Sequence, residues 1–198
     1  KSNNSEVKMK KTLALVSLLM TCSLVANAHD IVSTVDYSKY RLGNNSLTGI
    51  ELGLLAEFDL TENIAVTAGY YTINANLGSI ELEGSGTAIG AKYSAPVSET
   101  TQTFVGFDLI QVNITGSVSG LSVSTDGSGN QITAGLTTQI TDNLNLFASM
   151  AQSRIGGGSN SSSKIGGQFY YDSGSYVGAT YSNTSDGNSI GILLGQSF

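Results

Sequence analysis

The sequence has few of the residues on which most catalytic and metal sites depend. It contains one cysteine, one histidine and no tryptophan among 198 residues. The cysteine, Cys22, lies in a segment that we expect to be removed, so the remaining chain has no thiol for a disulfide, a nucleophile or a metal ligand. The histidine, His29, stands at the expected mature amino terminus, where no strand would hold it. We therefore expect no enzyme, no metal site and no cofactor.

Charge is scarce as well, and positive charge most of all. Charged residues make up 12% of the chain, against about 25% in an ordinary soluble domain. From His29 onward five basic residues stand against fourteen acidic ones, a net charge of −9. So few cations make the chain a poor ligand for a phosphate backbone, and we expect no nucleic-acid partner.

The sequence also lacks a hydrophobic run long enough for a membrane-spanning helix. Its one extended apolar run, at 12–25, is shorter than the ~20 residues that such a helix needs. This run follows Met9-Lys10-Lys11 and precedes Ala26-Asn27-Ala28, which together form the three parts of a secretory signal. We predict cleavage between Ala28 and His29. Residues 1–8 are then non-native or upstream residues, 9–28 the signal peptide and 29–198 the mature domain.

What the sequence has instead is alternation of apolar and polar residues. From Ile50 the even positions are apolar as far as residue 60, while the odd positions include Glu51, Gly53 and Glu57. A period of two places the two sets on opposite faces of a strand. The apolar positions resume after the turn Thr61-Glu62-Asn63, and the same turn chemistry returns as Thr141-Asp142-Asn143. The chain therefore repeats one hairpin.

The alternation predicts ten strands, at residues 31–40, 47–60, 64–74, 86–96, 102–115, 130–140, 144–155, 164–172, 175–182 and 189–198. Their connections are short at 61–63, 97–101, 141–143 and 173–174, long at 75–85 and 116–129, and intermediate at 156–163. The Gly/Ser-rich stretches within 126–130 and 156–158 are interpreted as flexible surface loops. Short turns at one end and longer loops at the other are typical of a bacterial outer-membrane barrel. We predict an all-β fold, an antiparallel up-and-down transmembrane β-barrel of about ten strands, with eight possible.

The two faces of these strands differ in composition. One face is apolar and uncharged, and includes Ile89, Ala91, Tyr93, Val105, Phe107, Leu109, Ile132, Ile165, Phe169, Ile190 and Ile192. The other is rich in glycine, serine and threonine and carries Glu51, Glu57, Lys92 and Asp108. A soluble sandwich would place many lysines and glutamates on its polar face, whereas a narrow lumen accommodates small residues and a few paired charges.

Lys92 is the one basic residue in the middle of a predicted strand on the polar face. A buried charge is tolerated when it is paired. We predict a lumen charge network in which Lys92 pairs with Asp108 on the next strand, or with Glu51 and Glu57. The alternative is that Lys92 sets the selectivity of a small pore.

The carboxyl-terminal strand alternates Ile190, Ile192 and Leu194 before ending on Phe198. Together with the signal and the Thr-Glu/Asp-Asn turns, this ending resembles small Gram-negative outer-membrane β-barrels of the OmpA/OmpX-like type. The resemblance covers the whole mature chain, which differs in having ten predicted strands instead of eight. It implies an outer-membrane location, contact with the lipid bilayer and lipopolysaccharide, and recognition of Phe198 by the barrel-assembly machinery.

Three functions fit these observations. The first is a non-enzymatic outer-membrane barrel whose surface loops act in adhesion, envelope stability or recognition of a ligand that the sequence leaves unknown. The second is a narrow porin-like channel for small solutes, because ten strands leave slightly more lumen than eight. The third is a secreted soluble β-protein. We favour the first.

Overall fold

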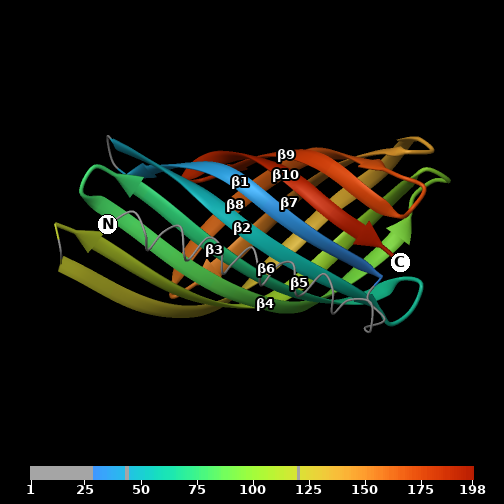
Figure 1. The fold of residues 1–198 in the computed structure, drawn as a ribbon. Coiled ribbons are helices and arrows are strands. Elements are labelled where there is room, and N and C mark those ends of the chain that lie inside the picture. The colour runs from blue at the N-terminus through green and yellow to red at the C-terminus, as the bar shows by residue number, and fades with distance from the viewer. Residues whose placement is uncertain (1–28, 43–44, 120) are drawn as a thin grey trace.

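The computed structural model describes residues 29–42, 45–119 and 121–198, which form one closed antiparallel barrel (Figure 1). Residues 1–8 and the predicted signal peptide 9–28, including Ala28, lie outside the described residues. The strands are β1 (Asp30–Leu42), β2 (Asn45–Asp59), β3 (Ile64–Leu77), β4 (Ile80–Pro96), β5 (Thr101–Val118), β6 (Leu121–Thr141), β7 (Leu144–Ile155), β8 (Gly158–Tyr170), β9 (Ser175–Thr184) and β10 (Gly187–Ser197). Within the described ranges, no helix has the length and apolarity needed to cross a bilayer.

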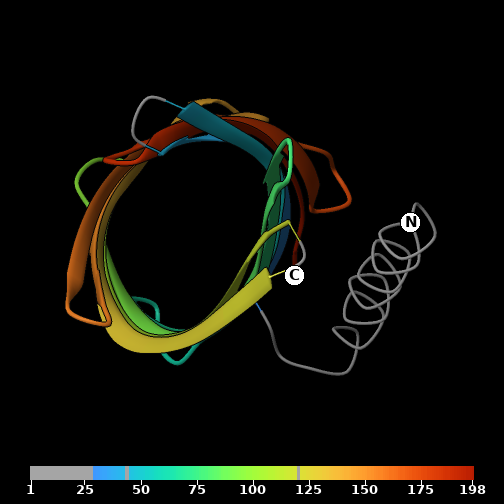
Figure 2. The same cartoon turned by 90° about the vertical axis from the view of Figure 1, so that its left-hand side faces the viewer.

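Each strand pairs with the next along the chain, and β1 closes the barrel by pairing with β10. Figure 2 looks along the barrel and shows the closed wall. This confirms the predicted all-β, up-and-down architecture and decides for ten strands over eight. Because the ladder is closed, it has no free edge that must find another partner.

We call the two ends of the barrel the base and the rim. The base carries the turns at 60–63, 97–100, 142–143 and 171–174 together with the start of β1 and the end of β10, and lies to the right in Figure 1. The two repeated turns perform the same task there. The Asn63 amide donates to the Ser94 carbonyl at 2.8 Å, and the Asn143 amide donates to the Tyr170 carbonyl at 3.0 Å. Each turn thus fastens its hairpin to the following hairpin.

At the rim the prediction of long loops at 75–85 and 116–129 and of an intermediate loop at 156–163 is wrong. The strands on either side continue through these segments. Two-residue turns remain at 78–79 and 156–157, and β5 and β6 stay paired as far as Val118 and Leu121. Gly156 and Gly157 have φ angles of 57° and 85°, as a tight hairpin turn of type I′ requires. The stretch 126–130, expected to be a flexible loop, is part of β6.

Cross-strand hydrogen bonds between side chains help to explain why the polar segments at the rim pair as strands. In the β5–β6 hairpin the Thr115 and Ser124 hydroxyls lie 3.1 Å apart, and those of Ser117 and Ser122 lie 2.8 Å apart. Pairs of hydroxyl residues opposite one another stabilise an antiparallel ladder. The described part of the rim therefore consists of extended hairpins.

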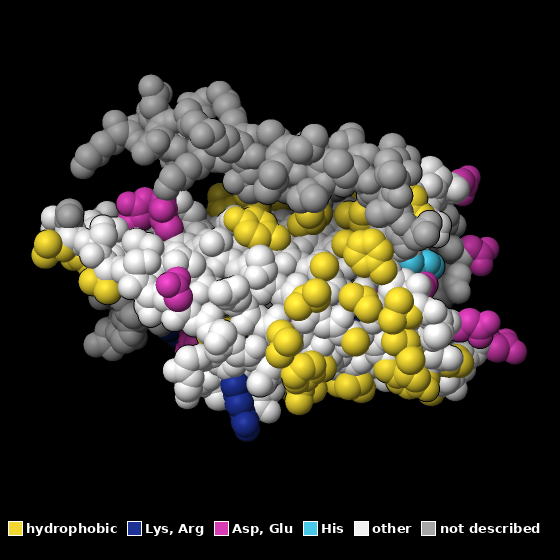
Figure 3. Space-filling model, turned by 90° about the horizontal axis from the view of Figure 1, so that it is seen from below, with side chains coloured by type: hydrophobic (Ala, Val, Ile, Leu, Met, Phe, Trp, Pro, Cys, Tyr) yellow, Lys and Arg dark blue, Asp and Glu magenta, His cyan; other side chains and the backbone are white. Residues whose placement is uncertain are grey.

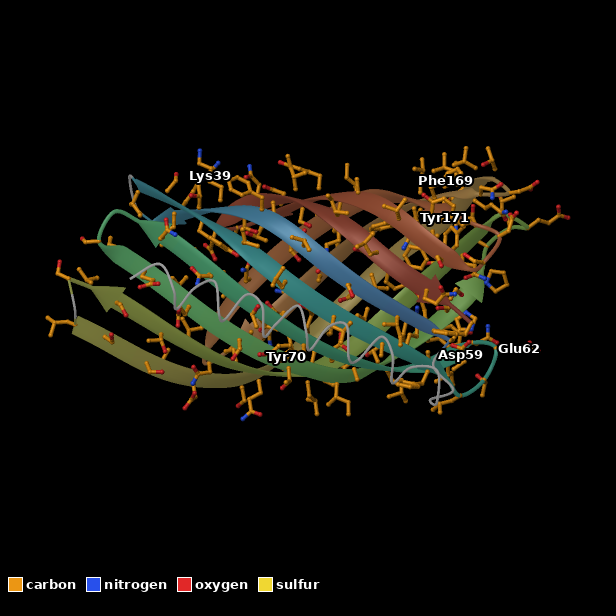
Figure 4. The ribbon with its side chains drawn as sticks, in the orientation of Figure 1. Lys39, Asp59, Glu62, Tyr70, Phe169 and Tyr171 are labelled. Carbon is orange, nitrogen blue, oxygen red and sulfur yellow. The ribbon has the colours of Figure 1, made fainter. Side chains whose placement is uncertain are left out.

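The outer wall is apolar only in the half nearest the base. Figure 3 shows hydrophobic side chains gathered over that half and mostly uncoloured polar surface toward the rim. We call this zone the apolar belt; its exposed members are Val35, Tyr37, Ile50, Tyr70, Ile89, Tyr93, Val105, Phe107, Leu109, Ile132, Leu136, Leu146, Met150, Ile165, Phe169, Tyr171, Tyr181, Ile190, Ile192 and Leu194. Phe169 and Tyr171 lie at its base edge, Tyr70 lies midway along the barrel, and Lys39 lies toward the rim (Figure 4). The predicted apolar face is thus the outer face.

Beyond the belt, on β3–β6, the outer face becomes polar and the inner face becomes apolar. The outward row Ala68, Ile89, Leu109 is followed by Tyr70, Thr87, Gln111 and then by Thr72, Ser85, Asn113. On the inward side of the same segment the residues become apolar, and we call this surface the inner rim face: Ile73, Ala75, Leu82, Ile110, Val112, Ile114, Val118, Leu121 and Val123. Ala75, Ile110 and Val112 are buried, whereas Leu121 and Val123 near the tip are exposed.

Candidate functional site

The candidate site is the polar lumen enclosed by the belt. Its inward side chains reach across to strands two places away: Tyr176 on β9 donates to Asp30 on β1, and Thr67 on β3 donates to Asp108 on β5 at 2.8 Å. Strands two places apart are separated by about 9.6 Å. Side chains bridge this distance only on the concave side of the curved wall, where they converge. These contacts identify the glycine-rich, charged face as the lumen face.

Lys92 on β4 forms an ion pair with Glu57 on β2, across the intervening strand β3. The Lys92 ammonium also lies 5.8 Å from the centre of the Phe104 ring, within the range of a cation–π interaction. The side chains of Lys92 and Glu57 remain 27% and 15% exposed. The pair is therefore partly hydrated inside the lumen.

The other two members of the predicted charge network do not contact Lys92. Asp108, which stands across from Gly90 on β4, accepts its hydrogen bond from Thr67. Glu51 lies closer to the rim and accepts from the Ser38 and Tyr40 hydroxyls. Among the described lumen side chains, Lys92 and Glu57 form an ion pair, and separate hydroxyl–carboxylate contacts lie along the length of the lumen.

Asp30, Asp36, Tyr176 and Lys164 also face the lumen and were not among the predicted site residues. The Tyr176 hydroxyl lies 3.1 and 3.0 Å from the two carboxylate oxygens of Asp30, and Thr180 donates to Asp36 at 3.4 Å. The alternation along β1 would have placed Asp30 and Asp36 on the inner face. Their partners on β9 depend on how β1 and β10 pair to close the barrel. With Glu51, Glu57 and Asp108, these acids outnumber the inward cations Lys92 and Lys164.

Aromatic rings in the lumen lie against glycines on the neighbouring strand. Phe104 stands across from Gly135 and Phe147 across from Gly166. A Cβ added to Gly135 would lie 2.6 Å from Phe104 Cζ, and one added to Gly166 would lie 2.5 Å from Phe147 Cζ. Glycine at these positions lets each ring lie along the wall instead of across the lumen.

Two further observations define how open the lumen is. The inward side chain of Leu55 is 41% exposed, so space for water remains beside the charged pair. Toward the rim, by contrast, the β3–β6 wall is lined by the inner rim face. An apolar lining opposes passage of ions where it forms a constriction that excludes water.

The two ends of the described chain meet at the base. The Phe198 amide donates to the His29 carbonyl at 2.9 Å, and the Phe198 ring is exposed. The expectation that no strand would hold His29 is wrong: its amide donates to the Glu57 carbonyl at 2.8 Å, and its Nδ1 lies 3.1 Å from the Asp59 carboxylate. In the part of the chain that the structure describes, no group of three or more acidic, histidine or cysteine side chains could hold a metal ion.

Comparison with known proteins identifies the fold and no nearer relationship. No family model matches the chain, and no curated protein matches it in sequence. Among solved structures, the chain is similar to the translocator domain of the autotransporter NalP from Neisseria meningitidis, with 11% identity, 100% of this chain and 98% of that chain covered, and a TM-score of 0.53. It is also similar to the beta domain of the Bordetella autotransporter BrkA, with 10% identity, 87% and 100% covered, and a TM-score of 0.51.

Proposed function

We propose that this chain is an integral outer-membrane β-barrel of a Gram-negative bacterium that acts without catalysis, through its rim, in adhesion, envelope stability or recognition. The observation that carries the proposal is the apolar belt, which encircles the base half of the barrel and ends where the outer wall becomes polar. Its exposed apolar side chains come from all ten strands, whereas large contiguous apolar patches are rare on monomeric soluble proteins. The belt therefore weighs against the secreted soluble alternative.

The height of the belt supports insertion in a bilayer. On β5 it extends from the base to Leu109, about half of the strand Thr101–Val118. Nine residues of a tilted strand suffice to cross the hydrocarbon core, for which about 9–11 are needed. Every strand in this zone has a neighbour on both sides, so its backbone groups are paired as lipid surroundings demand.

The base faces the periplasm and the rim faces the cell exterior in this proposal, as short turns and long extensions do in barrels of this type. The surroundings of the belt are then the lipid bilayer and lipopolysaccharide. Phe198, exposed at the base, is the residue that the barrel-assembly machinery recognises. This last role rests on the resemblance of the terminal strand to small outer-membrane barrels.

Single-cysteine labelling tests the orientation. Because the expected mature chain lacks cysteine, Ser79→Cys at a rim turn and Glu62→Cys at a base turn each carry one thiol. Both residues are exposed. We expect a membrane-impermeant maleimide to label Ser79→Cys in intact cells, and to label Glu62→Cys only after the outer membrane is permeabilised. The reverse pattern would contradict the orientation.

A second candidate function is a narrow channel for small solutes. The partial exposure of Leu55 and of the Lys92–Glu57 pair favours it, and the excess of inward acids predicts a preference for cations. The inner rim face opposes it. Single-channel recording in planar bilayers separates the two functions: steady, cation-selective openings would support the channel, and a silent bilayer containing folded protein would support the surface role.

A further inference from the structure

A depression lies on the outer wall at the rim edge of the belt. It spans β3 to β6 and is lined by Tyr70, Ser85, Thr87, Gln111, Asn113 and Asp126, with Gly86 and Val112 at its floor. Thr87 stands between Tyr70 and Gln111, and Asn113 stands between Ser85 and Asp126. The small side chains on β4 lie between larger ones on β3 and β5, and this produces the hollow. Tyr70 marks its place midway along the barrel (Figure 4).

The position of the depression relates it to the surface of the membrane. The neighbouring row toward the base holds Ala68, Ile89 and Leu109, the last wholly apolar row on these strands. The depression begins at the next row. If the belt lies in the hydrocarbon core, the depression lies where acyl chains end and the headgroups of the outer leaflet begin.

The lining residues suit a neutral polar ligand with many hydroxyl groups. Gln111 and Asn113 both donate and accept hydrogen bonds, and the Asp126 carboxylate accepts them. The Asn113 amide donates to one Asp126 oxygen, which orients the carboxylate and leaves its other oxygen for a ligand hydroxyl. The Tyr70 side chain is 37% exposed, so its ring can pack against the apolar face of a sugar. Among the residues that line the depression none is basic, and its one charge is negative, which disfavours a phosphate group.

From this geometry we propose that the depression binds the saccharide headgroup of a glycolipid in the outer leaflet. Tyr70 provides a stacking surface, while Gln111, Asn113 and Asp126 hydrogen-bond the sugar hydroxyls. The proposal rests on the proposed function, because it needs the belt to lie in the outer membrane with the rim outside. It adds to that function a defined lipid site on one side of the barrel wall.

The test uses the full chain folded in detergent, with a neutral glycolipid, digalactosyl diacylglycerol, as the probe and native mass spectrometry to measure the fraction of barrels that retain it. The site variant is Gln111→Ala with Asp126→Ala. The matched control is Asn183→Ala with Asn188→Ala, which removes two exposed amides that pair on β9 and β10, one row beyond the belt residues Tyr181 and Ile190. Folding of each protein into phospholipid vesicles is followed separately by gel mobility.

We expect the site variant to retain the probe about tenfold more weakly, the loss expected for one or two net hydrogen bonds, while the control and the unmodified chain behave alike. Equal retention by all three proteins, or an equal loss in the control, would refute the site. So would displacement of the probe by phosphatidylethanolamine at similar concentration. Binding of the free digalactose headgroup as tightly as the whole glycolipid would refute a glycolipid ligand in favour of a soluble glycan. Failure of the unmodified chain to enter vesicles would instead refute the proposed function.

Discussion

Replacing Lys92 by methionine removes the positive charge of the lumen ion pair while keeping most of the side-chain length. Glu57 is then left without its cation in a partly enclosed space. Breaking a fully buried pair costs about 3–5 kcal/mol, and an exposed pair contributes about 0–1 kcal/mol. Because the Lys92 and Glu57 side chains remain 27% and 15% exposed, we expect a loss of about 1–3 kcal/mol in the free energy of unfolding. Loss of the contact with Phe104 falls within that range.

Ala91→Arg is the matched comparison for Lys92→Met. Ala91 is the next residue along β4 and faces outward in the belt, between Val66 and Phe107. An arginine near the midplane of the bilayer costs about 2–4 kcal/mol. We therefore expect Ala91→Arg to hinder insertion into lipid vesicles and Lys92→Met to insert normally but unfold at a lower denaturant concentration. Unheated gel mobility measures insertion, and urea titration of the inserted protein measures stability.

A double-mutant cycle with Glu57→Gln isolates the pair itself. If the loss in Lys92→Met comes from an unpaired carboxylate, the double variant regains part of the stability lost in the single variant. If Ala91→Arg inserts normally and Lys92→Met does not insert, the inner and outer faces are interchanged, and every assignment in register with β4 is wrong. If both variants insert and unfold like the unmodified chain, the ion pair does not contribute to stability.

Four further predictions follow from the fold and the sequence. Unheated protein in dodecyl sulfate should migrate as a compact species and shift on boiling, since a closed ladder has no edge to fray; one mobility at both temperatures would argue against closure. Deletion of Phe198 should lower the amount of assembled barrel in membrane fractions, and unchanged amounts would remove its role in assembly. Asn63→Ala and Asn143→Ala should each cost about 1 kcal/mol in urea unfolding, and a neutral result would mean that water replaces the amide. Amino-terminal sequencing of the exported protein should begin at His29, and a start inside the predicted leader would contradict cleavage after Ala28.

The alternation of side chains was enough to predict the wall of the barrel. The outer and inner faces of β4 and β5 differ strongly in composition. The exposed side chains of Ile89, Phe107 and Leu109 lie on the face that was predicted to be apolar. The turn chemistry was equally informative, because Asn63 and Asn143 fasten neighbouring hairpins in the same way. These features are local in sequence, so a single chain contains them.

The rim was missed because its residues have low strand propensity. Residues 116–129 are mostly glycine, serine and threonine, which suggested a loop, but the partner strand supplies the pairing that propensity alone does not. A signal was present nonetheless. Within that stretch Leu121 and Val123 alternate with Ser122 and Ser124, so the period of two continues in the segment that was interpreted as a loop.

The partners of the lumen charges could not be read from parity. Parity places Lys92, Asp108 and Glu57 on one face, yet Lys92 reaches across β3 to Glu57 while Asp108 turns to Thr67. Which residues meet two strands apart depends on the stagger and tilt of the closed barrel. Stagger and tilt are properties of the closed barrel and cannot be predicted from one hairpin.

At 78–79 and 156–157 the rim hairpins end in two-residue turns, so paired strands continue to the tip there. Beyond Leu109, β5 continues for the nine residues 110–118; at about 3.3 Å per residue and a tilt of about 40°, its tip stands about 20 Å above the belt. A peptide inserted between Gly156 and Gly157 would be carried at a fixed height and angle, and its own flexibility would be the main source of movement. The barrel would then be a scaffold for surface display. An insertion that disrupts a hairpin above the belt would leave the half of the barrel that carries the belt intact.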